Sequence, residues 1–227
     1  MKILLTNDDG IDAVGLSVLA EAAKKYGDIY WMAPIGAQSG CSHQVTAHAP
    51  LRVEHFGANR FAVNGFPADC VRVALRHLRI QPDWIFSGVN HGGNLGVDVF
   101  LSGTMAAVRE GAIYGIPGIG FSHYRAKNRD FDWDRVARML PRAIEAIFEL
   151  PREKKEYWSV NFPHLSAEIA DPDVDFCQLD TTPMAFDWVK NGDQIDYLSH
   201  YHERLRTNGS DVQACFNGKI AITKLLL

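Results

Sequence analysis

Residues 1–10 read MKILLTNDDG, a short apolar run that ends in two adjacent aspartates and a glycine. The apolar run at 2–6 predicts a buried strand, and the polar residues behind it predict a turn. Asn, Asp and Gly are all frequent in turns. However, two neighbouring carboxylates repel each other unless a positive charge lies between them. Asp8 and Asp9 therefore suggest more than a turn.

Strand-like and helix-like segments alternate through the first two-thirds of the chain. Further strands are predicted at 29–33, 84–87 and 117–121, a hairpin at 51–56 and 60–63, and helices at 15–26, 67–78, 105–114 and 134–150. Such alternation is typical of an α/β fold, with a doubly wound, mostly parallel, Rossmann-like sheet and helices on both faces.

The pattern changes after about residue 156, where YWSVNF, DVDFCQL and KIAITKLLL read as strands. The polar, aromatic-rich segment 187–208 predicts an excursion from the core, either a long hairpin or a subunit contact. We expect a single domain over 1–227, with a core at roughly 1–165, a terminal strand at 211–225 and a C-terminal β extension at 166–210 that makes dimer contacts.

The overall composition narrows the class of protein. The chain has 227 residues, 47% of them hydrophobic, and a net charge of -4, which argues against a basic surface for a nucleic-acid duplex. No apolar stretch approaches the roughly 18 residues that span a bilayer, and the N-terminus does not resemble a secretory signal. The four cysteines are far apart and predict free thiols. We expect a cytoplasmic protein without membrane contact.

Polar loops follow the first three predicted strands of the core, with the sequences NDDG, PIGAQSG and GVNHGGNLG. The carboxyl ends of parallel strands meet at one edge of the sheet, where ligands bind. The loops supply carboxylates from Asp8 and Asp9 and neutral oxygens from Ser39, Asn90 and Asn94. Hard divalent cations such as Mg²⁺ prefer this mixture of oxygen ligands. We therefore predict a metal site at this edge.

Glycines are concentrated next to these loops, since nine of the nineteen lie between residues 88 and 120. Such segments let backbone N–H groups approach a ligand closely. Ser102, Gly103 and Thr104 precede a predicted helix, whose start offers unpaired N–H donors to a phosphate. Alternatively, Ser102 or Thr104 is only the helix cap. A phosphate site facing a metal predicts phosphoryl transfer or hydrolysis.

Four segments resemble the SurE family (survival protein E), whose members are metal-dependent 5′-nucleotidases and phosphatases. They are ILLTNDDGIDAVGL, AP…QSG, GFPADCVRVAL and SGVNHGGNLGVDVFLSGTMAAVREG, with a weaker match at SDVQACFNGKIAIT. The resemblance implies a doubly wound core, an extended β region that helps to form a homodimer or higher homo-oligomer, and nucleoside 5′- and 3′-monophosphates as substrates, with short polyphosphate in some members. The family usually has Thr where Phe66 stands, which bears on substrate preference.

The resemblance also implies the residues of the site. It implies one divalent metal ion, Mg²⁺ or Mn²⁺, held by Asp8, Asp9, Ser39 and Asn90, and a phosphate pocket formed by Asn94, Ser102, Gly103 and Thr104.

We expect direct hydrolysis, in which Asp8 or Asp9 orients a metal-bound water or accepts its proton. An aspartyl-phosphate intermediate is the competing mechanism. It is disfavoured because the haloacid dehalogenase pattern places its two acids one residue apart, whereas these two are adjacent.

The alternative function is a non-enzymatic regulatory module that binds a metal or nucleotide. A receiver domain would need a phosphorylatable Asp after the third strand, where this chain has SGVN. A dinucleotide binder would need GxGxxG after the first strand, which does not occur.

Four of the nine histidines are candidates for a role in the site. His91 could donate a proton to a leaving group, although a loop histidine without an identifiable partner is more often a solvent-exposed residue. For His43, the pocket wall and the surface both remain open. His200 and His202 lack the further ligands of a zinc site.

Aromatic residues are frequent in the predicted excursion. For Phe186, Tyr197 and Tyr201 we favour packing or a dimer contact over stacking on a nucleobase.

Overall fold

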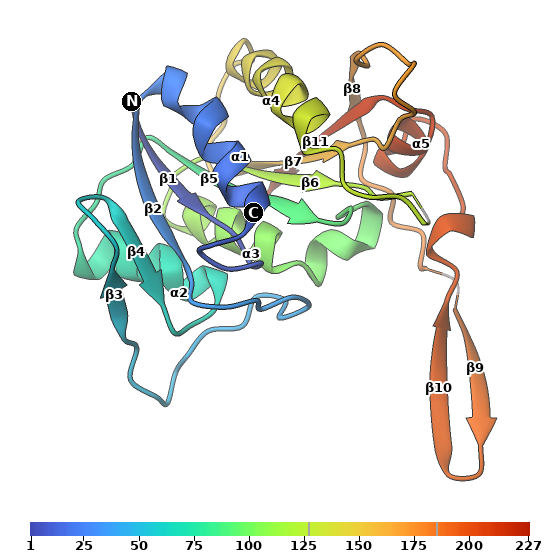
Figure 1. The fold of residues 1–227 in the computed structure, drawn as a ribbon, viewed down its shortest axis with the longest axis horizontal. Helices are drawn as coiled ribbons and strands as arrows, with labels where there is room; N and C mark the ends of the chain where they lie inside the picture. The colour runs from blue at the N-terminus through green and yellow to red at the C-terminus, as the bar shows by residue number, and fades with distance from the viewer. Residues whose placement is uncertain (127, 185) are drawn as a thin grey trace.

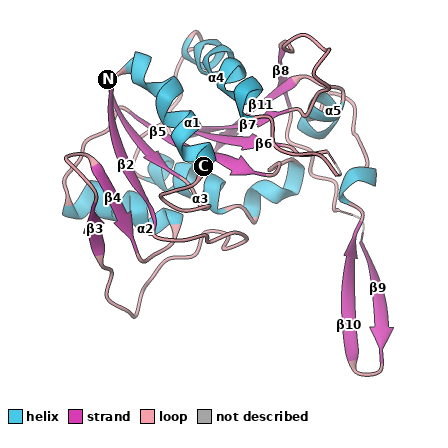
Figure 2. Ribbon diagram, in the orientation of Figure 1, coloured by secondary structure: helices cyan, strands magenta, loops and turns pink. Residues whose placement is uncertain are grey.

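Helices cover both faces of one large sheet in the computed structural model, which describes residues 1–126, 128–184 and 186–227 (Figures 1 and 2). Within these residues the sheet has nine strands, and a separate ribbon has two. In order across the sheet, the strands are β3 (Val53–His55), β4 (Arg60–Val63), β2 (Asp28–Pro34), β1 (Lys2–Thr6), β5 (Trp84–His91), β6 (Gly118–His123), β7 (Glu156–Phe162), β11 (Ile220–Leu226) and β8 (Val174–Cys177).

The six strands from β4 to β7 are parallel, while β3 pairs antiparallel with β4 as the predicted hairpin. From β1 the chain winds outward through β2 to β4, and from β5 it winds in the opposite direction through β6 to β7. Helices α1 (Val14–Ala23) and α4 (Trp133–Phe148) pack on one face, and α2 (Pro67–Arg72) and α3 (Gly103–Ile113) on the other. The doubly wound fold is therefore confirmed, and β1 and β5 flank its switch point.

The apolar pattern explains these elements. The last four residues of β1 are buried, as expected of a parallel strand covered on both faces. Helix α4 buries Val136, Met139, Leu140, Ala143 and Ile144, whose spacing of three or four residues forms one apolar face. The pattern of apolar residues in the sequence therefore predicts both β1 and α4.

The C-terminal part differs from the prediction in one element. Residues 211–225 were expected to form a strand, but Asp211–Phe216 form helix α5 and the strand begins at Ile220. The helix is capped by Ser210, whose Oγ accepts a hydrogen bond from the backbone N–H of Gln213 at 3.2 Å. Strand β11 then pairs antiparallel with β7 and parallel with β8.

The excursion is a hairpin that projects away from the core (Figure 1). Strands β9 (Phe186–Asn191) and β10 (Gln194–Ser199) pair antiparallel and form what is here called the hairpin arm, residues 186–199. Of the two alternatives, the hairpin is observed and the subunit contact stays a prediction.

Two simpler expectations concern cysteines and membrane spans. All four cysteines are free thiols, as predicted. In the described ranges, no helix is both long enough and apolar enough to cross a membrane.

Candidate active site

The turn after β1 is closed by Asn7 and Gly10. The Asn7 Nδ2 donates to the Gly10 carbonyl oxygen at 2.8 Å, and the Gly10 N–H donates back to Asn7 Oδ1 at 3.2 Å. Gly10 has a φ of 104°, a conformation that favours glycine. The flanking residues therefore make the turn, and it does not require two carboxylates between them.

Asp8 is buried at the start of α3. Its Oδ1 accepts a hydrogen bond from the Thr104 hydroxyl at 2.6 Å, and the residue as a whole is 3% exposed. Burial raises the pKa of Asp8 to about 6, the neighbouring charge of Asp9 acts in the same direction, and the hydrogen bonds from Thr104 oppose them. A cation beside this carboxylate would relieve both destabilising effects.

Asp9 contacts His91 twice. Its Oδ2 accepts from the backbone N–H of His91 at 3.2 Å and lies 3.0 Å from His91 Nδ1. The ring of His91 also packs edge-on against Phe131 and Trp133, with centroid distances of 5.1 and 4.9 Å. His91 therefore has a carboxylate partner that the sequence did not reveal, because 82 positions separate the two residues.

Residues from three of the predicted loops and from the start of α3 line one cavity of about 230 Å³. Five of the eight predicted site residues line it, namely Asp8, Ser39, Asn90, Asn94 and Ser102. His91 and Asp98 line it too; the sequence raised His91 only as a candidate proton donor, and it gave no signal for Asp98. The cavity opens at the carboxyl ends of β1 and β5, where a doubly wound sheet binds its ligands.

The three residues at the start of α3 have different contacts. The Oγ of Ser102 accepts from the Met105 N–H at 3.1 Å, so Ser102 is the helix cap and also lines the cavity. Thr104 is fully buried, so its hydroxyl supports Asp8 rather than lining the cavity. A Cβ on Gly103 would lie 2.9 Å from the Cβ of Asp8, so only glycine allows this approach.

Asn90 and Asn94 are oriented by donating their amide groups. Asn90 Nδ2 donates to the Gly92 carbonyl oxygen at 2.9 Å, which leaves its Oδ1 as the atom suited to a cation. Asn94 Nδ2 donates to Ser122 Oγ, and its backbone N–H donates to Asn161 Oδ1, both at 2.8 Å. Asn161 on β7 thus supports the glycine-rich segment, although no sequence motif marked it.

The segment that carries Ser39 is attached to α3 through His43. His43 Nε2 lies 2.7 Å from Glu110 Oε2, and its Nδ1 accepts from Arg109 Nε at 2.9 Å. Glu110 also accepts from Arg72 Nε at 2.7 Å. Although burial alone would raise the pKa of Glu110, the hydrogen bonds from His43 and Arg72 lower it below its ordinary value. His43 therefore attaches this segment and does not line the cavity.

The histidines near the hairpin arm do not converge. His200 Nε2 lies 2.9 Å from Asp187 Oδ2, whereas His202 Nδ1 lies 2.9 Å from the Tyr124 hydroxyl. Tyr197 and Phe186 pack against each other on the arm at 5.0 Å, while Tyr201 lies beyond it and contacts the core.

The donor set fits a hard divalent cation. Over residues 1–126, 128–184 and 186–227, no group of three or more His, Cys, Asp or Glu residues could hold a metal ion. A cation at Asp8 and Asp9 would thus draw its other ligands from neutral oxygens, and Ser39 and Asn90 line the same cavity as Asp8. Two carboxylates with neutral oxygens suit Mg²⁺ or Mn²⁺.

These features define a doubly wound α/β protein with an oxygen-rich acidic site at its switch point, next to a helix N-terminus. The chain belongs to the SurE family, since the family model described as "Survival protein SurE" matches residues 3–185.

Similar proteins carry related names. A Nostoc sp. protein with a provisional 5′-nucleotidase name is 44% identical over 225 residues, which cover 99% of each chain. The 5′-nucleotidase SurE of Rhodospirillum rubrum is 37% identical, over 99% of this chain and 89% of its own. The crystal structure of the SurE protein from Aquifex aeolicus matches with a TM-score of 0.85 and 29% identity, over 100% of this chain and 93% of that one. The predicted family, fold and hydrolase class are thus confirmed.

Proposed function

We propose that this chain is a divalent-metal-dependent phosphomonoesterase that hydrolyses nucleoside 5′-monophosphates, and also 3′-monophosphates, to nucleoside and phosphate. The names of its relatives support nucleotidase or phosphatase activity in general. The observation that carries the proposal is that Asp8, Asn90 and Ser102, at the ends of β1 and β5 and the start of α3, line one cavity.

The metal would be held by Asp8, Asp9, Ser39 and Asn90. When bound, it would neutralise charge on the phosphate and lower the pKa of a coordinated water. The repulsion between the two carboxylates, which now helps to keep the pKa of Asp8 high, would then favour binding.

The phosphate would be bound at the N-terminus of α3. This helix has 11 residues, and its N-cap residue Ser102 lines the cavity. Gly103 and Thr104 would provide backbone N–H donors from this first turn, and Asn94, which lines the same cavity, would provide an amide donor. These groups position the phosphorus for attack by water.

Proton transfer would use the acidic pair and His91. The attacking water forms the new P–O bond and loses its proton to Asp8 or Asp9, while the ester P–O bond breaks. His91 donates a proton to the departing oxygen of the nucleoside, with its Nδ1 held by Asp9 at 3.0 Å. A positioned acid of this kind contributes about 10²–10⁴-fold to the rate.

Phosphate release from a panel of nucleoside monophosphates tests the proposal, with Mg²⁺, Mn²⁺ or a chelator, for the parent and for Asp9→Asn. We expect metal-dependent release by the parent and a fall of roughly 10³-fold for Asp9→Asn. Glu54→Gln, at a half-exposed position on β3, is the control and should match the parent. Nucleotide binding without release under any metal would instead support the regulatory module, and trapping of a phosphorylated aspartate would reject direct hydrolysis.

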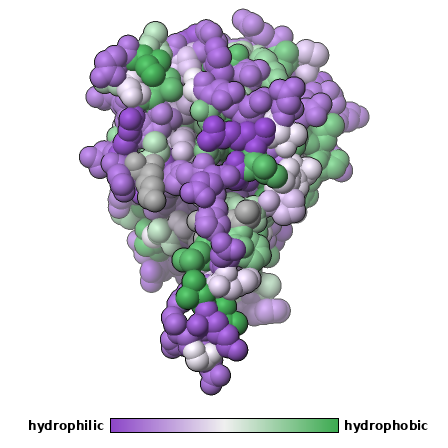
Figure 3. All heavy atoms as spheres, turned by 90° about the vertical axis from the view of Figure 1, so that its right-hand side faces the viewer, coloured by the Kyte–Doolittle hydropathy of each residue, from purple (hydrophilic) through white to green (hydrophobic). Residues whose placement is uncertain are grey.

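We also propose that the protein acts as a cytoplasmic homodimer or higher homo-oligomer through the hairpin arm. The arm exposes Trp188 by 60%, Ile195 by 60% and Tyr197 by 50%. Figure 3 shows hydrophobic side chains on the projecting part of the molecule. Exposed aromatic residues of this kind are enriched at protein interfaces.

A further inference from the structure

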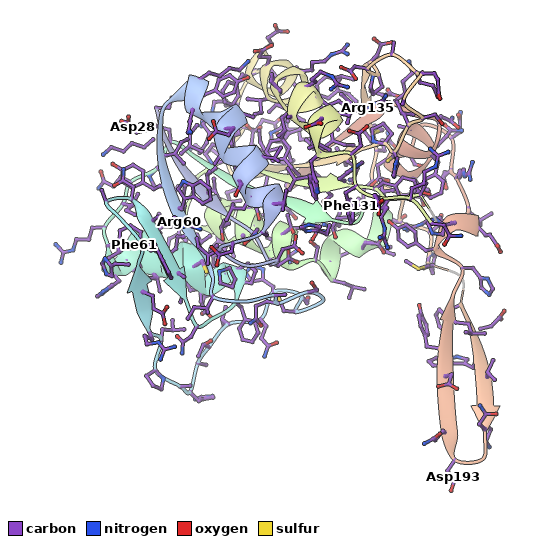
Figure 4. The ribbon with its side chains drawn as sticks, viewed as in Figure 1. Asp28, Arg60, Phe61, Phe131, Arg135 and Asp193 are labelled. Atoms are coloured by element: carbon purple, nitrogen blue, oxygen red, sulfur yellow. The ribbon has the colours of Figure 1, made fainter. Side chains whose placement is uncertain are left out.

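An ion pair joins the cavity of the candidate active site to the C-terminal extension. This cavity of about 230 Å³ is here called the acidic cavity. Among the described residues that line it, the acids are Asp8 and Asp98, and none is a lysine or an arginine. Arg204, which is outside this lining, donates from Nη1 to Asp98 Oδ2 at 2.8 Å. It follows the hairpin arm in the sequence, and the arm itself points away from the core with Asp193 at its tip (Figure 4).

Both members of this ion pair are buried. The side chain of Arg204 is 4% exposed and that of Asp98 is 13% exposed. Arg204 also donates from Nη2 to the Leu95 carbonyl oxygen at 3.2 Å, and its guanidinium lies 5.2 Å from the centroid of the Tyr201 ring. Burial raises the pKa of Asp98, and the positive charge of Arg204 opposes this effect. Removing one member of such a pair is costly, because the other charge is then left uncompensated.

Asp98 is connected to the start of α3 as well. Its carbonyl oxygen accepts a hydrogen bond from the backbone N–H of Ser102 at 3.0 Å, and Ser102 caps α3 and lines the acidic cavity. Two residues before Asp98, the backbone N–H of Gly96 donates to Asp211 Oδ2 at 2.7 Å. Arg204 and Asp211 both follow the hairpin arm, so residues beyond the arm hold the glycine-rich segment from Gly96 to Ser102.

We infer that Arg204 is a positioning residue for phosphate binding, because it neutralises Asp98 at the wall of the acidic cavity and holds the segment that leads to Ser102. The inference rests on the proposed phosphomonoesterase function. A divalent cation would balance Asp8 and Asp9, which leaves Asp98 as the remaining acid in the lining of the cavity. Without Arg204, its carboxylate would repel a phosphate ester, which carries a charge of about −1.5 to −2 at pH 7. The extension thus serves the site in addition to its expected dimer contacts.

Calorimetry with inorganic phosphate and Mg²⁺ at pH 8 tests this charge balance. Arg204→Met should bind phosphate at least about 10-fold more weakly than the parent, because Asp98 is left uncompensated. Combining it with Asp98→Asn should return the affinity to within about 3-fold of the parent, since both charges are then absent. The control Arg135→Met removes another buried arginine, which lies on α4 and is labelled in Figure 4, and should leave phosphate affinity unchanged. An unchanged affinity in Arg204→Met, or no recovery in the double variant, would overturn the inference.

Asp98→Asn alone gives the decision if Arg204→Met does not fold. The asparagine keeps an oxygen acceptor for Arg204 but removes the negative charge. Phosphate affinity should therefore rise by about 3-fold or more, because the positive charge of Arg204 is no longer balanced. A pair with only a structural role would give unchanged or weaker binding, which would overturn the inference.

Kinetics with a nucleoside monophosphate separate the inference from the proposed function. In Arg204→Met, kcat/KM should fall mostly through KM, and Arg204→Lys, which keeps the charge, should recover most of the loss. Phosphate binding that follows the charges as described, without release of phosphate from any nucleotide, would support the role of Arg204 and reject the hydrolase proposal alone. Conversely, a parent that releases phosphate while Arg204→Met keeps the parent's KM and phosphate affinity would overturn the role of Arg204 and leave the hydrolase proposal intact.

Discussion

The acidic cavity buries a charged side chain, whereas the hairpin arm exposes large apolar side chains to solvent. Both arrangements are the reverse of the usual distribution of charged and apolar residues. Asp8 is a carboxylate that is 3% exposed in the core, whereas Trp188 is a large apolar residue that is 60% exposed. All six residues of β9 are exposed, while the last four residues of β1, just before the acidic pair, are buried. Under the proposed function, each region would be completed from outside the chain, the acidic pair by a cation and the hairpin arm by a second copy.

Both arrangements have a cost in the isolated chain. A buried carboxylate loses hydration and needs a compensating charge or hydrogen bonds. An exposed cluster of apolar residues keeps ordered water at its surface and favours association. These costs are the reason that we propose a cation and substrate site at the buried acids and a subunit contact at the exposed rings. Substitutions in the two regions should accordingly affect different measurements.

Among substitutions that leave the acidic pair in place, Gly103→Ala should give the largest effect, a fall of about 10²-fold in kcat/KM. The added Cβ would lie 2.8 Å from Cys41 Sγ and 2.9 Å from Asp8 Cβ, so the buried acid must shift. A shift of about 1 Å in an active site costs on the order of 10²-fold. Kinetics with a nucleoside monophosphate measure it.

Gly36→Ala is the matched control, because a Cβ there would enter open space. If Gly103→Ala retained the parent's activity, the close approach of α3 to Asp8 would not be needed for catalysis.

Asp8→Asn should stabilise the metal-free protein above pH 6 by as much as about 3 kcal/mol. The folded-state pKa of Asp8 is about 6, against 3.8 for an unperturbed aspartate, so the folded state binds more protons between these values. The parent's stability due to this group is therefore complete below pH 3.8 and is lost as the pH rises through 6. An asparagine side chain stays neutral across that window.

Urea unfolding at pH 4 and pH 7 in the presence of a chelator checks this, with the two proteins expected to differ mainly at pH 7. Adding Mn²⁺ should stabilise the parent and not the variant. A parent that is more stable than the variant at pH 7 with chelator would mean that the buried charge has another compensating partner.

Glu110→Gln should lower stability by about 1–2 kcal/mol at pH 7. It weakens charge-assisted hydrogen bonds to Arg72 and His43, each 2.7 Å long, in a side chain that is 1% exposed. Because the pKa of Glu110 is lowered on folding, this stabilisation is present above pH 4.5 and is lost as the pH falls below it. The variant should therefore approach the parent at acid pH in urea unfolding.

The same substitution should raise the KM for the nucleotide, because His43 attaches the segment that carries Ser39. Glu149→Gln, at an exposed helix end, serves as the comparison. Equal stability of the Glu110 variant and the parent at pH 7 would show that the contact contributes little.

The sequence predicted the features that are local or periodic. Examples are the buried strand followed by NDDG, the apolar face of α4 and the polar loops at one sheet edge. Each of them depends on a few residues that are close together in the sequence. The contacts of Asp9 with His91, of Asn94 with Asn161 and of Asp98 with Arg204 join residues 67 to 106 positions apart, and no short motif encodes them. Helix α5 has six residues, too few for periodicity to separate it from the strand that follows.

Trp188→Ser combined with Ile195→Ser should give the smallest effect on stability, within about 0.5 kcal/mol of the parent, because exposed side chains contribute little to the folded chain. The same double variant should lower the mass measured by light scattering from that of an oligomer to that of one chain, since it removes two of the most exposed apolar residues of the arm. Lys190→Ser on β9 is the control and should leave the mass unchanged.

Two outcomes would contradict this prediction. A destabilisation above about 1 kcal/mol would mean that the arm packs on its own core. A parent that is already a single chain in solution would remove the argument for the arm as an interface. Either result would narrow the difference between the two regions, whereas a change in mass alone would show that the arm and the acidic cavity each depend on a different partner.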